Sequence, residues 1–144
     1  MPTSTPILSN VFDAPVTPVT GRSILTLDYG TNTSTSNTFI IIGGDASNFD
    51  TTETVVDTTI NFGFQATRIN ANVLSNASTV NRIFAFRDDG ANVGAITIIA
   101  LTSGQVNSGA ITTNIATGSL CNWALALDAV GGTAMAGHME YALV

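Results

Sequence analysis

The sequence predicts an all-β protein built as a single β-sandwich, and three observations lead to that fold class. Hydrophobic residues make up 44% of the chain and charged residues only 10%. The polar remainder is rich in Thr, Ser, Asn and Gly, which suit strand surfaces and turns. Polar turn segments separate short apolar runs about every ten to fifteen residues, and an Asp-Gly pair between two such runs indicates a hairpin. Among sandwich topologies we expect a jelly roll.

The 144 residues fit one domain, expected over residues 21–144, preceded by an extended arm over residues 1–20. Prolines at positions 2, 6, 15 and 18 disfavour a helix or a central strand in this arm. Its large apolar side chains would form an adhesive patch if they stayed exposed. We therefore predict that four of them, Ile7, Leu8, Val11 and Phe12, dock on another surface. The alternative is a disordered terminus that contains a few hydrophobic residues.

Strands separated by polar loops are predicted between the arm and the hairpin. Residues 23–29 alternate apolar and polar side chains, which is the period of a half-buried strand. Residues 38–42 form a continuous apolar run, which favours a strand covered on both faces. Strands are also predicted at 60–64 and 68–74, either separate or joined through a bulge. The acidic segment 45–59 is predicted to be a solvated loop, with calcium binding as the alternative.

The clearest local signal is the segment 81–100, where Asp89 and Gly90 fit the central positions of a type I′ turn. Such a turn predicts four facing pairs: Arg87 with Asn92, Phe86 with Val93, Phe84 with Ala95, and Ile83 with Ile96. We expect the face with Phe84 and Phe86 to fill the sandwich. The opposite face is expected to meet a covering segment or a neighbouring subunit, and the predicted subunit interface consists of Ile83, Ile96 and Ile98.

The chain after the hairpin is predicted to contain a turn-rich connector at 101–109 and three strands. The first strand lies within 110–117 and the last within 138–144, which alternates up to its final residue. In the strand at 120–129, the alternation places four side chains on one side, facing the core: Cys121, Trp123, Leu125 and Leu127.

The charge balance narrows the classes of partner. Ten acidic residues against four arginines give a net charge of −6 and a pI near 4.2. No basic surface is therefore expected to bind nucleic acid. No apolar run is long enough to cross a bilayer, and the N-terminus lacks a signal-peptide pattern, so no membrane partner is expected. A single cysteine cannot form an intrachain disulfide.

No reaction signature is present, so we expect a non-enzymatic protein without a cofactor or a metal. Cys121 and His138 are the only residues of their types and would form the only thiol–imidazole pair. The alternation places Cys121 in the core and His138 on the side of Glu140, which argues against catalysis. One cysteine and one histidine are too few ligands for structural zinc.

Four further polar residues have structural explanations in the sequence. Asp88 and Asp89 are explained by the hairpin turn rather than by paired-carboxylate chemistry. Arg82 and Arg87 are expected at solvated surface positions or in ion pairs, including pairs across a subunit interface.

Apolar side chains on both faces of several strands exceed what one sandwich can bury, so we expect oligomerisation. A trimer of sandwiches hides one outer face of each copy around a threefold axis.

The segments FAFRDDGANVGAITI, LTSGQVNSGAITTNIATGS and AGHMEYALV resemble β-sandwich structural proteins of tailed bacteriophages, notably capsid decoration or cement proteins. The resemblance implies a homotrimer on the capsid exterior of the virion that stabilises the head. Its partner would be the major capsid protein, gripped by the N-terminal arm. A similar trimeric jelly roll is found in tumour-necrosis-factor-like heads.

The alternative function is a carbohydrate-binding receptor tip or lectin-like module of a phage tail or head fibre. It requires Trp123 or Tyr29 as an exposed platform on which a sugar stacks, whereas the alternation buries both side chains. A hydrolytic fibre domain is a third alternative.

Overall fold

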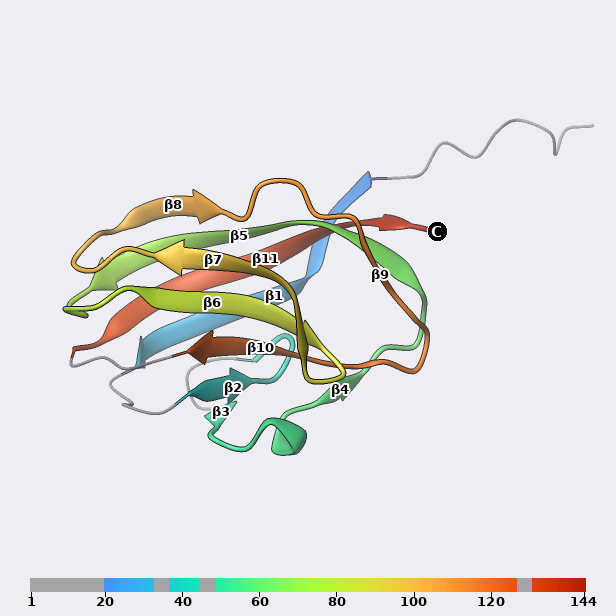
Figure 1. Cartoon of the computed structure of the whole chain (residues 1–144), viewed down its shortest axis with the longest axis horizontal. Coiled ribbons are helices and arrows are strands. Elements are labelled where there is room, and N and C mark those ends of the chain that lie inside the picture. The colour runs from blue at the N-terminus through green and yellow to red at the C-terminus, as the bar shows by residue number, and fades with distance from the viewer. Residues whose placement is uncertain (1–19, 33–36, 45–48, 127–130) are drawn as a thin grey trace, which may run out of the picture.

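A computed structural model describes residues 20–32, 37–44, 49–126 and 131–144, whose strands form two packed antiparallel β-sheets (Figure 1). The predicted all-β sandwich is confirmed. The predicted arm at residues 1–20 lies outside the described residues apart from Thr20, where the first strand begins. The four docking residues predicted in the arm, Ile7, Leu8, Val11 and Phe12, lie outside them as well.

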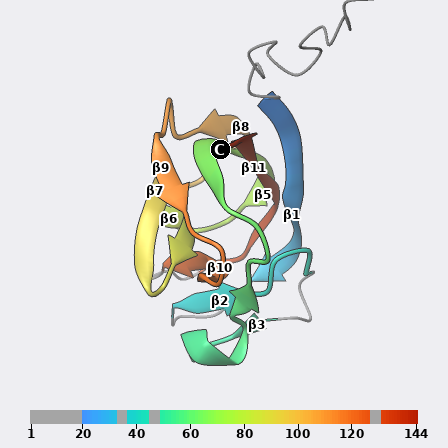
Figure 2. The ribbon, with the colours of Figure 1, turned by 90° about the vertical axis from the view of Figure 1, so that its right-hand side faces the viewer.

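The two sheets form the two layers of the sandwich, which Figure 2 shows from one end. Sheet A contains, in spatial order, β1 (Thr20–Asn32), β11 (Thr133–Leu143), β5 (Phe64–Asn76) and β8 (Gly104–Asn107), and β9 (Thr113–Ile115) also pairs with β5. Sheet B contains β3 (Phe49–Asp50), β2 (Thr38–Ile40), β10 (Leu120–Ala126), β6 (Arg82–Asp88) and β7 (Ala91–Ile98), and β4 (Thr58–Thr59) also pairs with β10. A single 3₁₀ turn, η1 (Glu53–Val55), lies between β3 and β4.

The strand pairs are nested along the chain. β1 pairs with β11, β2 with β10, β5 with β8, and β6 with β7, so that each pair encloses the next one in sequence. Successive pairs alternate between sheet A and sheet B, and the pairings of β11 with β5 and of β10 with β6 join them within each sheet. The hairpin at 81–100 is the innermost pair of this series.

Most of the strand predictions are confirmed, with three differences. The acidic segment predicted as a loop contains the short strands β3 and β4 and the turn η1. The segments predicted at 60–64 and 68–74 form one strand, β5, which starts only at Phe64. Ile60 instead accepts a hydrogen bond from the Gly118 N–H at 2.7 Å and donates one to the Ser119 carbonyl at 2.9 Å. The segment predicted as a connector contains β8, because Gln105 and Val106 continue sheet A beside β5.

The core lies between the sheets and is centred on Trp123, which is completely buried. Its ring stacks on Phe84 with centroids 4.8 Å apart and meets the edge of Phe86 at 5.0 Å. Cys121 and Leu125 are also fully buried on this side of β10, as the alternation predicts, whereas Leu127 lies outside the described residues.

The hairpin turn forms as predicted, with Asp89 and Gly90 both at positive φ, 47° and 81°. Arg87 faces Asn92, also as predicted. Beyond that pair the predicted register is wrong, because Val93 is an extra residue in β7 and Phe86 faces Gly94.

The one-residue shift moves each later side chain of β7 to the opposite face of the sheet from the one predicted. Phe84 faces Ile96 and Arg82 faces Ile98, and both isoleucines are buried, at 3% and 1% exposure. The predicted placement of Ile96 and Ile98 on an outer subunit interface is therefore wrong. Ile83 does lie on the outer face, at 37% exposure.

Ile96→Asp should unfold the domain or destabilise it by at least about 4 kcal/mol, because it places a charge in the core without a partner. Ile83→Asp, the matched change on the outer face of the same hairpin, should leave the fold intact. Urea denaturation followed by Trp123 fluorescence measures both. Equal losses of stability would contradict the register described here.

Gly137→Ala should lower the free energy of unfolding by about 1–3 kcal/mol, because an added Cβ would stand 2.8 Å from the ring of Phe84. Gly63→Ala is the matched control, since its Cβ would meet nothing nearer than 3.5 Å. Thermal unfolding should show a clear decrease in melting temperature for Gly137→Ala alone. A similar decrease for both variants would point to backbone effects rather than to the contact with Phe84.

Candidate functional site

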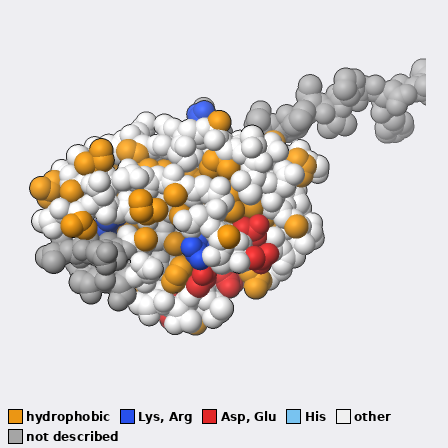
Figure 3. All heavy atoms as spheres, viewed as in Figure 1, with side chains coloured by type: hydrophobic (Ala, Val, Ile, Leu, Met, Phe, Trp, Pro, Cys, Tyr) orange, Lys and Arg blue, Asp and Glu red, His pale blue; other side chains and the backbone are white. Residues whose placement is uncertain are grey.

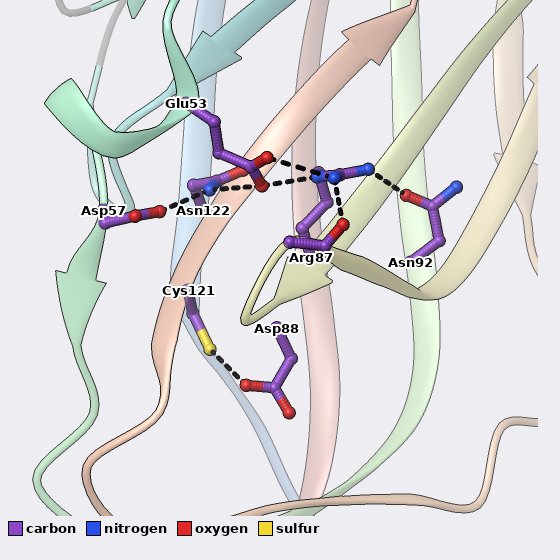
Figure 4. Close-up of polar contacts among 8 residues, drawn as sticks. Glu53, Asp57, Arg87, Asp88, Asn92, Cys121 and Asn122 are labelled. Atoms are coloured by element: carbon purple, nitrogen blue, oxygen red, sulfur yellow. Dashed lines mark hydrogen bonds and ion pairs between the residues drawn. The ribbon is translucent and has the colours of Figure 1, made fainter.

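A polar cluster on sheet B, which we call the Glu53–Arg87 cluster, joins η1 to β6 (Figure 4). Arg87 donates from Nε to Glu53 Oε1 at 2.5 Å and from Nη2 to Oε2 at 3.1 Å, so both carboxylate oxygens are held. The same guanidinium donates to Asn92 Oδ1 at 2.8 Å and to the carbonyl oxygen of Gly90. It also lies 5.6 Å from the centroid of the Phe39 ring.

Asn122 of β10 extends the cluster into the interior. Its side chain is fully buried and donates from Nδ2 to Asp57 Oδ1 at 2.7 Å and to Glu53 Oε1 at 3.1 Å. Asn122 alternates along β10 with the core residues Cys121 and Trp123, so it points to the outer face of sheet B. The segment from η1 to β4 therefore covers this face, which explains why β10 is buried on both sides.

The pKa of Glu53 is lowered from its ordinary value of 4.5, chiefly by the hydrogen bonds from Arg87. Burial opposes this shift, while the hydrogen bond from Asn122 and the charge of Arg87 add to it. A carboxylate held ionised in this way by a guanidinium is not poised to donate a proton. The chemistry of the cluster is that of a structural ion pair.

The structure does not bring Cys121 and His138 together. Cys121 lies in the core on sheet B, and its Sγ is 3.7 Å from Asp88 Oδ1. Burial, with the nearby Asp88 charge, raises the pKa of this thiol well above its ordinary value. His138 lies on β11 in sheet A, between the buried residues Gly137 and Met139 and so on the other face of that strand. The thiol is therefore protonated and far from the imidazole.

The carboxylates near the hairpin turn and in the acidic segment serve local structure. Asp89 Oδ1 accepts a hydrogen bond from the Leu120 N–H at 3.0 Å, which fastens the turn to β10. Asp50 Oδ1 accepts one from the Thr52 N–H at 2.7 Å. Within the described ranges, no three His, Cys, Asp or Glu side chains gather as metal ligands would, and Asp45 lies outside those ranges.

Of the two arginines of β6, Arg82 differs from its predicted surface position, whereas Arg87 forms one of the ion pairs that were the predicted alternative. Arg82 is completely buried and donates from Nη2 to the Gly131 carbonyl at 3.3 Å. Its alternation with Phe84 and Phe86 places it on the core face, which the sequence pattern already indicated. Arg87 makes its ion pair with Glu53 of the same chain, so no second subunit is needed to satisfy it.

The remaining candidate sites are surfaces. Trp123 is fully buried and cannot serve as a sugar platform, and the side chain of Tyr29 is outside the described part of the structure. Large apolar side chains are exposed on the side of sheet B, where Figure 3 shows patches of apolar atoms beside a group of acidic side chains. On the outer side of this sheet they are Ile41 at 38%, Val55 at 66% and Ile83 at 37%.

Comparisons with protein-family models, with curated proteins and with solved structures gave no significant match for this chain. Among the residues that the structure describes, no helix is long and apolar enough to span a membrane.

Glu53→Gln should lower the free energy of unfolding at pH 7 by about 1–3 kcal/mol, because the charge-assisted bonds from Arg87 are lost. The folded state depresses the pKa of Glu53, so its contribution is present above pH 4.5 and disappears as the pH falls through the folded pKa. The difference in the free energy of unfolding between wild type and variant should therefore decrease at acidic pH. Urea denaturation between pH 7 and pH 3 measures it.

Asp50→Asn is the control for this experiment, because Asp50 Oδ1 accepts a hydrogen bond from the Thr52 N–H at 2.7 Å and takes no part in the ion pair. At pH 7 this control should lose less free energy of unfolding than Glu53→Gln does. A gap for Glu53→Gln that stays constant down to pH 3 would contradict the role given to the ion pair.

Proposed function

We propose that this chain is a non-enzymatic structural protein of a virion, a capsid decoration protein that binds the outer capsid surface as a homotrimer. The observation that supports it most is the exposed apolar surface on the outer side of sheet B, with Ile41, Val55 and Ile83. Apolar side chains gathered on one side of a small protein favour a contact with another protein surface. The Glu53–Arg87 cluster and the buried thiol fit a structural role, because their groups are committed to holding the fold.

We also infer that the sandwich is a jelly roll. The nested pairs β1·β11, β2·β10, β5·β8 and β6·β7 alternate between the sheets, which is what results when one long hairpin of strand pairs wraps around a core. This topology supports the resemblance to phage decoration proteins. Fold alone does not fix function, because jelly rolls serve capsids and lectins alike.

Association of copies offers a way to cover the exposed side chains on sheet B. Three copies around a threefold axis would each hide one outer face, with Ile83 as the remaining predicted interface residue on the hairpin. The net charge of −6 opposes association, so the apolar contacts between copies have to outweigh this repulsion.

Deleting residues 1–19 should abolish binding to undecorated capsids of the phage that encodes this chain, because the apolar arm residues would be lost. The truncated chain starts at Thr20, where β1 begins, so its sandwich should stay folded. Co-sedimentation with capsids measures binding, and circular dichroism checks the fold. The control is the full-length chain with Thr3→Ala and Ser4→Ala, which keeps every apolar residue of the arm and should bind normally.

Normal decoration by the truncated chain would show that the arm does not grip the capsid. Binding of the full-length chain to a glycan array, without capsid binding, would favour the receptor-tip alternative instead.

A further inference from the structure

One end of the sandwich leaves part of its apolar inner surface uncovered, and Figure 2 looks onto this end. Phe64 of β5 is completely buried, whereas Leu143, its partner on β11, is 51% exposed. Phe62, just before β5, is 44% exposed although it belongs to a group of touching rings. Its centroid lies 5.6 Å from that of Phe64 and 6.2 Å from that of Tyr141. We call Phe62, Tyr141 and Leu143 the open end.

The chain outside the described structure attaches beside the open end. Thr20 pairs with Ala142 and Gly21 with Tyr141, so residues 1–19 join the sandwich next to these side chains. Adjacent strands lie about 4.8 Å apart, which places the open end within about 10 Å of Thr20. The apolar residues closest to that junction in the predicted docking cluster are Val11 and Phe12.

The reach of this segment fits the distance. Between Phe12 and Thr20 lie seven residues, which span at most about 25 Å when extended. They can therefore turn back by about 10 Å and still place Phe12 over the rings of Phe62 and Tyr141. A tether of this length gives a local concentration in the millimolar range, so even weak apolar contacts are populated.

We propose that residues 7–12 of the chain fold back and cover the open end of their own sandwich. Burying Ile7, Leu8, Val11 and Phe12 against Phe62, Tyr141 and Leu143 removes two adhesive apolar surfaces from water at once. In the free protein, the arm is then docked on its own sandwich rather than exposed to solvent. Whether the arm later leaves for a capsid depends on the function proposed above, but the docking itself does not.

A pair of engineered cysteines tests the docking in the full-length protein. In Phe12→Cys with Leu143→Cys, the two thiols should form a disulfide under mild oxidation, because docking brings them within bonding distance. The native Cys121 does not interfere, since it is buried and its thiol is protonated. The product should run as a monomer on a non-reducing gel, and titration should show the loss of two of three thiols.

The matched control pairs Phe12→Cys with Leu101→Cys. Leu101 is 68% exposed, and its N–H bonds to Ser78, just beyond the far end of β5. The 13 residues of β5 separate the two ends by about 40 Å. This control should stay unlinked. Equal linkage in both pairs, or none in the first, overturns the proposal, and so do disulfide-linked dimers, which would place the arm on a second copy.

A second measurement covers the case in which the cysteine pair disturbs folding. In full-length Phe12→Asp, backbone amides around Phe62 should exchange with solvent at least about tenfold faster than in wild type, because the arm no longer covers them. Unchanged exchange there overturns the docking. Docking confirmed by both measurements, with no binding of the full-length chain to capsids, would leave this inference standing and refute the proposed function.

Discussion

The close approach of the two sheets at Gly137 is the constraint on which the rest of the structure depends. Phe84 reaches from sheet B to the bare backbone of Gly137 in sheet A, where a Cβ would stand only 2.8 Å from its ring. Trp123 stacks on Phe84 and meets the edge of Phe86, so three aromatic rings fill the layer between the sheets. The nested strand pairs wrap around this centre, and the Glu53–Arg87 cluster fastens the segment that covers its outer side.

The sequence predicts the parts of the fold that depend on local chemistry. The Asp89–Gly90 turn and the core face of β10 follow from turn preference and alternation, and both are confirmed. The sequence does not predict the register of β7, because a single bulge at Val93 exchanges the faces on which the following side chains lie. The residue that marks the bulge is Gly94, where an added Cβ would overlap the Cδ1 of Ile111 from a distant segment. No local pattern contains that contact.

In the candidate sites as well, features set by local sequence can be predicted and contacts between distant residues cannot. Alternation along β6 indicates that Arg82 lies on the core face with Phe84. The partnership of Glu53, Arg87 and Asn122 cannot be predicted in this way, because 34 and 69 residues separate Glu53 from its two partners. The cluster resembles an active site only in composition. Each of its carboxylates is bound by an arginine or an amide, so we propose the exposed apolar surfaces, rather than the polar groups, as the sites of contact with partners.

The central claim is that this chain works by association through those surfaces. Sedimentation equilibrium of the full-length protein at micromolar concentration tests it most directly. The account predicts a species of three times the 14.8 kDa chain mass. A species at the mass of a single chain, unchanged up to high micromolar concentration, would contradict it.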